Sequence, residues 1–123
     1  MKSFVLVIAL AFGCSTSDVC RGNECVCAAN SPCSTDCVAG GGPCEVQCSP
    51  GEPCSVGCAN GETCHVECSG STSCSVDCAG TPDCHVTCPG NSCTVHNCVG
   101  PDCVVACGLT GAGTHNGSTV TCP

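Results

Sequence analysis

The chain has 123 residues, of which 21 are cysteines, and ten acidic residues stand against two basic ones. There is no Trp or Tyr, and both phenylalanines lie within the first twelve positions, so the rest of the chain has no aromatic side chain for a core. The formal net charge of −8 excludes binding to DNA, to RNA or to a membrane through basic residues, because such a surface repels anions. So many cysteines in so short a chain indicate a disulfide scaffold or a metal–thiolate protein.

The N-terminal segment predicts export. Residues 1–3 carry Lys2, residues 4–12 are all apolar, and Gly13 and Cys14 follow them. A short basic region, an apolar run and a small residue at the cleavage site are the parts of a secretory signal. Nine apolar residues are too few to cross a bilayer as a helix. We therefore expect residues 1–13 to be a signal peptide.

The residues around this cleavage site resemble the lipobox of bacterial lipoproteins. Residues 10–14 read Leu-Ala-Phe-Gly-Cys, with Phe12 where that family usually has a small residue. The resemblance implies cleavage before Cys14 and a lipid on its sulfur, which would anchor the protein in the outer or cell-surface membrane. Twenty cysteines (21 − 1) would then remain, an even number that suits disulfides. The alternative is cleavage at the same bond without lipid, and secretion.

A block of the form C-x-V-x-C recurs every ten residues between Cys44 and Cys88. In a β-strand the two Cys and the Val share one face, and the polar x positions share the other. Gly follows each block closely, often beside Pro, and ends the strand in a turn. Self-similarity at a constant short period predicts a repeat fold whose copies stack on one another.

Variant copies extend this repeat in both directions. Residues 33–37 carry Thr at the Val position, residues 93–98 hold one extra residue, and residues 118–122 begin with Ser. We expect a Cys-rich decapeptide-repeat domain over residues 32–123. Residues 14–31 are expected to form a lipidated tether and an irregular N-terminal cap.

A rhythm of twenty residues overlies the rhythm of ten. Ser55 and Ser75 alternate with His65 and His85 at the first x position. This predicts two strands per coil, so that residues twenty apart stack directly. The expected fold is all-β, a thin two-sheet β-solenoid held by disulfides. An antiparallel β-meander with five-residue loops is the alternative, because it has the same strands with different neighbours.

Disulfides are expected to stabilise this fold, because one Val per ten residues is a small apolar core to set against the cost of ordering the chain. Two Cys four apart in one strand lie about 13 Å apart, beyond the roughly 7 Å that a disulfide allows. Bridges must therefore join different blocks, and pairs of the type Cys54–Cys68 and Cys58–Cys64 are predicted. The expected framework comprises Cys33, Cys37, Cys44, Cys48, Cys54, Cys58, Cys64, Cys68, Cys74, Cys78, Cys84, Cys88, Cys93, Cys98, Cys103 and Cys107.

Metal binding is the main rival hypothesis. His65 and His85 would stack on the outer face about 4.8 Å apart, and with Glu67 they offer ligands that suit Zn or Cu. The alternative is that they are ordinary solvated side chains. Free thiols are a second route, since the composition resembles that of metallothioneins. The C-x-V-x-C spacing differs from the C-x-C and C-x-x-C spacings of that family.

Catalysis is not expected, because the chain has no G-x-S-x-G motif, no redox C-x-x-C motif and no implied cofactor. The architecture resembles that of Cys-rich insect antifreeze proteins, but their arrays of Thr-x-Thr are absent. We therefore expect a structural or interaction module at the cell envelope, with a protein or surface partner and no nucleic acid. Metal sequestration is the alternative, and a secreted ice-binding or defence protein is a weaker one.

Overall fold

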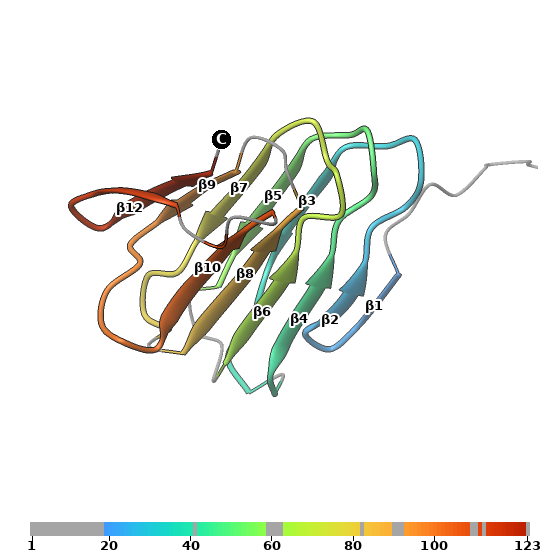
Figure 1. Ribbon diagram of the computed structural model, residues 1–123. Coiled ribbons are helices and arrows are strands. Elements are labelled where there is room, and N and C mark those ends of the chain that lie inside the picture. The colour runs from blue at the N-terminus through green and yellow to red at the C-terminus, as the bar shows by residue number, and fades with distance from the viewer. Residues whose placement is uncertain are drawn as a thin grey trace, which may run out of the picture.

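The computed structural model describes residues 19–40, 42–58, 63–81, 83–89, 93–108, 111 and 113–122. The expected signal peptide and the expected lipidation residue, Cys14, lie outside these residues. The described part of the chain forms two β-sheets that face each other (Figure 1). The strands in chain order are β1 (Val19–Arg21), β2 (Glu24–Val26), β3 (Cys33–Asp36), β4 (Cys44–Gln47), β5 (Cys54–Gly57), β6 (Cys64–Glu67), β7 (Cys74–Asp77), β8 (Cys84–Cys88), β9 (Cys93–His96), β10 (Cys103–Cys107), β11 (Thr114–Asn116) and β12 (Thr119–Cys122).

From β2 to β10 the chain passes alternately between the two sheets. Sheet A has the order β1-β2-β4-β6-β8-β10, and sheet B has the order β11-β12-β9-β7-β5-β3. Neighbouring central strands are parallel, and residues twenty apart are partners, as in the pairs His65↔His85 and Val56↔Val76. The predicted two-sheet solenoid with two strands per coil is therefore confirmed, and the central strands are not an antiparallel meander.

The coil length varies slightly toward the ends. Cys74 pairs with Cys93, nineteen residues on, because the bridge Cys88–Cys93 spans five residues where the central bridges span six. Glu24 pairs with Glu45, twenty-one residues on. The solenoid tolerates these changes in its turns while the strands keep their inward and outward alternation.

The core consists of cysteine and valine. In β4, β6 and β7 the residues alternate buried and exposed, with the first Cys and the Val inward. Val66, Val76 and Val95 are fully buried between the sheets. Each inward row therefore continues from coil to coil, while the x positions face solvent.

Ten disulfides lie among the described residues, and none joins the two cysteines of one block, as predicted. Eight of them join the last Cys of one block to the first Cys of the next: Cys27–Cys33, Cys37–Cys44, Cys48–Cys54, Cys58–Cys64, Cys68–Cys74, Cys78–Cys84, Cys88–Cys93 and Cys98–Cys103. Cys20–Cys25 and Cys107–Cys122 lie at the two ends.

The predicted pairing is correct for Cys58–Cys64 and wrong for Cys54–Cys68. Cys54 bonds to Cys48, and Cys68 bonds to Cys74. Strand β5 lies between β4 and β6 along the solenoid axis, so Cys54 has a candidate partner on either side. The bridge to Cys48 closes a loop with a sequence separation of 6, and a shorter loop costs less entropy to close.

The N-terminal cap is more regular than expected. Val19–Arg21 and Glu24–Val26 form an antiparallel hairpin, which adds β1 to the edge of sheet A. Asn23 in its turn accepts a hydrogen bond from the Val38 N–H at 2.8 Å and donates to the Val38 carbonyl at 2.9 Å. These bonds fasten the hairpin to the turn after β3.

The last copy of the repeat reverses its direction. Val120 and Cys122 are buried, as the repeat pattern predicts, but β12 runs antiparallel to β9. The reason is a hairpin between β11 and β12, in which Gly117 has a φ of 61°. The extra residue of the copy at 93–98 is Asn97, which follows β9 with a φ of 56°.

Candidate functional site

The outer face of sheet A presents two rows of side chains. One row contains Glu24, Glu45, His65, His85 and Val104. The next contains Val26, Gln47, Glu67, Thr87 and Ala106. The face is acidic near the N-terminal end, carries histidine in the middle and is neutral on β10.

His65 and His85 are neighbours on this face, as the repeat predicts. Their ring centroids are 6.1 Å apart and the rings meet edge to face, at 66°. His85 Nε2 lies 2.9 Å from Asp83 Oδ1, and both side chains are about half exposed (51% and 45%). Both rings are exposed, and two neighbouring imidazoles on one face are the kind of ligands that suit Zn or Cu.

The third predicted ligand, Glu67, lies in the adjacent row, where its register partner is Thr87. The carboxylate on His85 comes instead from Asp83, which the sequence interpretation missed. The spacing Asp83-Cys-His85 indicates this contact in the sequence, because residues two apart at the end of a strand share a face. A carboxylate on one ring nitrogen of a metal-binding His orients the ring and raises its basicity.

A hollow of about 660 Å³ lies beside His65 over β2, β4 and β6. Its exposed lining consists of Glu24, Val26, Glu45, Gln47, His65 and Glu67. Three carboxylates and one exposed Val (55%) make this surface suited to a cationic group with an apolar part. Glu67 therefore belongs to the acidic hollow.

The outer face of sheet B carries a row of hydroxyl side chains. Each of its members is the register partner of the next, across six strands: Ser34, Ser55, Ser75, Thr94, Thr121 and Thr114. The rhythm of twenty residues predicts the pair Ser55 and Ser75, and the register of the strands extends this row on both sides. The row offers hydrogen-bond donors and acceptors to a flat polar surface.

Asp77 lies in the row beside the hydroxyls on sheet B, where its register partners are Gly57 and His96. The Asn97 side-chain amide donates to Asp77 Oδ1 at 2.8 Å, and the Ala79 N–H donates to the same oxygen at 3.0 Å. The hydrogen bond from Asn97, followed by that from Ala79, lowers the pKa of Asp77 below its usual value of 3.8. The carboxylate thus holds the turn after β9 to β7.

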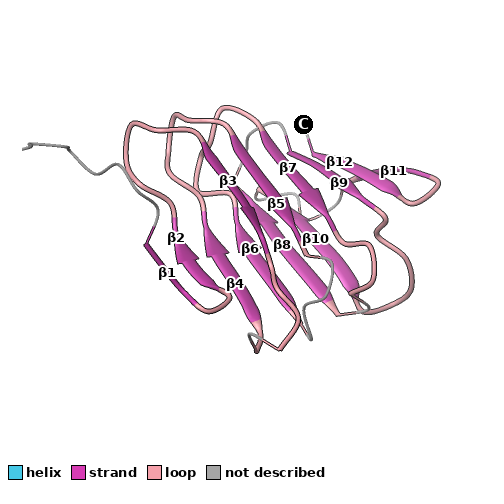
Figure 2. Cartoon of the chain, turned by 180° about the vertical axis from the view of Figure 1, so that it is seen from behind, coloured by secondary structure: helices cyan, strands magenta, loops and turns pink. Residues whose placement is uncertain are grey.

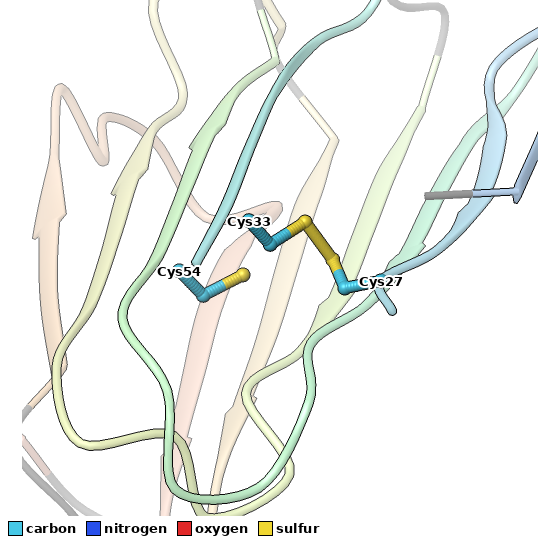
Figure 3. A group of neighbouring side chains, drawn as sticks. All are labelled: Cys27, Cys33 and Cys54. Carbon is cyan, nitrogen blue, oxygen red and sulfur yellow. A yellow bond between two sulfur atoms is a disulfide. The ribbon is translucent and has the colours of Figure 1, made fainter. Parts of the chain in front are cut away.

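The disulfides form two ladders, one along each edge of the coil. Sulfur atoms of successive bridges lie close together, as in the pairs Cys48–Cys74 at 3.9 Å and Cys58–Cys84 at 4.0 Å. The sulfur atoms within a triplet of cysteines, such as Cys27, Cys33 and Cys54, consequently lie within 4.8 Å of one another (Figure 3). Metals bind thiolates, and the sulfurs of all sixteen predicted framework cysteines are in disulfides. These triplets could take a metal only after reduction.

The fold and its ladders define a disulfide-stabilised two-sheet β-solenoid. The chain matches no protein-family model, and no curated protein sequence or solved structure is significantly similar to it. In the described part of the chain no helix is long and apolar enough to cross a bilayer. Ten disulfides in so small a domain are typical of an oxidising, extracellular environment.

Proposed function

We propose that this protein is an exported, non-catalytic structural or interaction module, anchored at the cell envelope through a lipid on Cys14. The observation that carries the proposal is the pair of continuous disulfide ladders, which cross-link every coil of the described solenoid. Such a fold suits a rigid module that resists heat and proteolysis outside the cell. Trypsin has only Arg21 to cut in a chain that begins at Cys14.

The outer faces supply the surface for a partner. Sheet A offers an acidic hollow, and sheet B offers a regular row of hydroxyls. Both suit a protein or a polar surface, and the excess of acidic residues disfavours nucleic acid.

Mass spectrometry of the mature N-terminus tests the anchor. We expect a chain that begins at Cys14 and carries a diacyl or triacyl group. An unmodified chain that begins at Cys14 would contradict the anchor and keep export. Retention of Met1 would contradict both.

Metal binding through His65 and His85 is the second candidate function, favoured by their contact and by Asp83 beside His85. Calorimetric titration with Zn²⁺ tests it. We expect heat of binding with the wild type and none with His85→Ala. His96→Ala is the matched control, because His96 lies on sheet B and should bind as the wild type does. Equal heat in all three proteins would show that the histidine pair is not the site.

A further inference from the structure

At each end of the solenoid one sheet extends one strand beyond the other, and the sheet that extends is a different one at each end. At the N-terminal end, sheet A has the extra strand β1 beyond β2, while sheet B begins at β3. At the C-terminal end, sheet A stops at β10, while sheet B continues beyond β9 with β12 and β11. Sheet A therefore projects at one end and sheet B at the other, with β1 and β11 at opposite ends of the molecule (Figure 2).

The two steps are complementary. Each sheet has six strands among the described residues. If a second copy is shifted by six strand spacings along the axis, its β1 comes next to β10 and its β3 comes next to β11. One shift of about 29 Å, six times the usual spacing of about 4.8 Å, thus continues both sheets.

Strand directions agree with this arrangement. Strand β1 is antiparallel to β2, whose direction β10 shares, so β10 and β1 of the next copy would pair antiparallel. Strand β11 has the direction of β9 and β3, because two antiparallel pairings separate β11 from β9. It would therefore pair parallel with β3 of the next copy.

Within its own residues, strand β10 lacks two features that commonly protect a sheet edge against pairing. Its sequence, Cys-Val-Val-Ala-Cys, contains neither charge nor Pro, the devices that commonly block an edge. The Gly108 N–H donates to the Cys88 carbonyl at 2.7 Å, which places Gly108 on the side of β8. The Asp102 carbonyl likewise accepts from β8. Because parallel ladders use alternate residues, the N–H and C=O of Val105 face away from β8.

Apolar exposure is concentrated in the first and last coils. Among the described residues the exposed large hydrophobics are Val26 and Val38 in the first coil and Val99 and Val104 in the last. Cys20 is exposed although its bridge to Cys25 lies on the inward side of the hairpin. The strands between these coils expose polar side chains almost throughout.

We propose that the protein associates head to tail with a second copy of itself, with the edge of β10 against β1 and the edge of β11 against β3. The contact joins two different surfaces and does not close, so association continues into linear chains. The net charge of −8 opposes it, and added salt should strengthen it by screening this repulsion. The inference goes beyond the proposed function and requires neither the lipid nor a ligand on the outer faces.

Analytical ultracentrifugation and small-angle scattering test the proposal on the full chain in its oxidised form. A Cys14→Ser background removes association through a lipid. We expect mass to grow continuously with concentration and to increase with salt. The largest dimension should increase by about 29 Å per added copy at constant cross-section.

The decisive variant is Val104→Lys. Val104 faces solvent on β10, so Lys fits the fold and places a charge at the pairing edge. We expect it to raise the concentration needed for association at least tenfold. Ser75→Lys adds the same charge to an exposed position in the middle of sheet B and should associate as the background does.

Three outcomes would overturn the inference. One is a protein that stays monomeric at every concentration up to about 1 mM, which corresponds to the dissociation constant of a weak contact. Another is assembly that stops at two copies, because a head-to-tail contact does not close. The third is equal weakening by Val104→Lys and Ser75→Lys, which would indicate that charge alone controls association.

Discussion

The middle of the solenoid and its two ends differ in how their strands pair, and the C-terminal end also differs in the length of its disulfide loop. From β4 to β9 neighbouring strands of each sheet are parallel, each strand buries its first Cys and its Val, and the bridges span five or six residues. At the ends the chain turns back in antiparallel hairpins. The last bridge, Cys107–Cys122, spans fifteen residues.

Repetition supplies a neighbouring strand to each strand in the middle, but not to the strands at the ends. In the middle, each residue stacks on an equivalent residue of the next coil, so one short pattern satisfies every strand. A terminal coil has no such neighbour on one side. The hairpins supply a strand for one sheet at each end and leave the other sheet, at β3 and at β10, without a further strand among the described residues.

Reduction of the disulfides is expected to destabilise the protein more than any single substitution, and to do so in the middle and at the ends alike. The Val positions are the main non-cysteine apolar residues in the core, so the reduced chain should lose its β circular-dichroism signal. Thiol counting should find about twenty thiols after reduction and almost none before it, in line with ten bridges. A β signal that survives full reduction would contradict the dependence on disulfides. Many free thiols before reduction would favour a metal–thiolate protein.

Removal of single bridges should separate the two regions. In the chain-entropy model, loss of Cys58–Cys64 costs about 2 kcal/mol and loss of Cys107–Cys122 costs about 3 kcal/mol, because the second closes the longer loop. Urea unfolding of the paired Cys→Ala variants measures both. A larger cost for the central bridge would show that the stacking of bridges in the ladder matters more than loop length.

Alanine substitutions at two glycines compare the packed C-terminal end with a strand in the middle of the solenoid. A Cβ on Gly113 would lie 2.6 Å from Val120 Cγ1 and 3.2 Å from the Thr121 carbonyl oxygen, at the packed C-terminal end. Gly113→Ala should therefore destabilise the protein by about 1–3 kcal/mol. The atoms nearest to a Cβ on Gly57 belong to the side chain of Asp36, whose carboxyl group can swing away. Gly57→Ala should change the unfolding free energy by less than about 0.5 kcal/mol, as is usual for surface substitutions. Equal costs for the two variants would contradict this distinction.

The smallest expected effect concerns the link between β7 and the turn after β9. Folding lowers the pKa of Asp77, so its contribution to stability is complete above the ordinary value of 3.8 and is lost as pH falls through the lower folded value. Asp77→Asn should be slightly less stable than the wild type at pH 7. The gap should narrow as the pH falls below 3.8 and through the lower folded pKa of Asp77. A gap that stays constant as the pH is lowered would show that the charge is not its origin.

Much of this protein could be predicted from its sequence. The alternation within C-x-V-x-C indicates which side chains point inward, and the alternation of Ser55 and Ser75 with His65 and His85 indicates two strands per coil. Geometry within one strand excludes a bridge inside a block. These conclusions follow because they depend on residues near one another in the chain or on an unbroken period.

Only the tertiary structure decided the remaining features. Cys54 faces a candidate partner on each side along the axis, and the period alone does not distinguish them. The hydroxyl row of sheet B, the approach of Asp83 to His85 and the reversal of β12 depend on how turns place strands in space. The sequence by itself therefore determined the repeating unit, whose pattern is local. The structure determined the bridge partners, the outer faces and the ends, because these depend on contacts between coils and on the loss of a neighbour where the repeat stops.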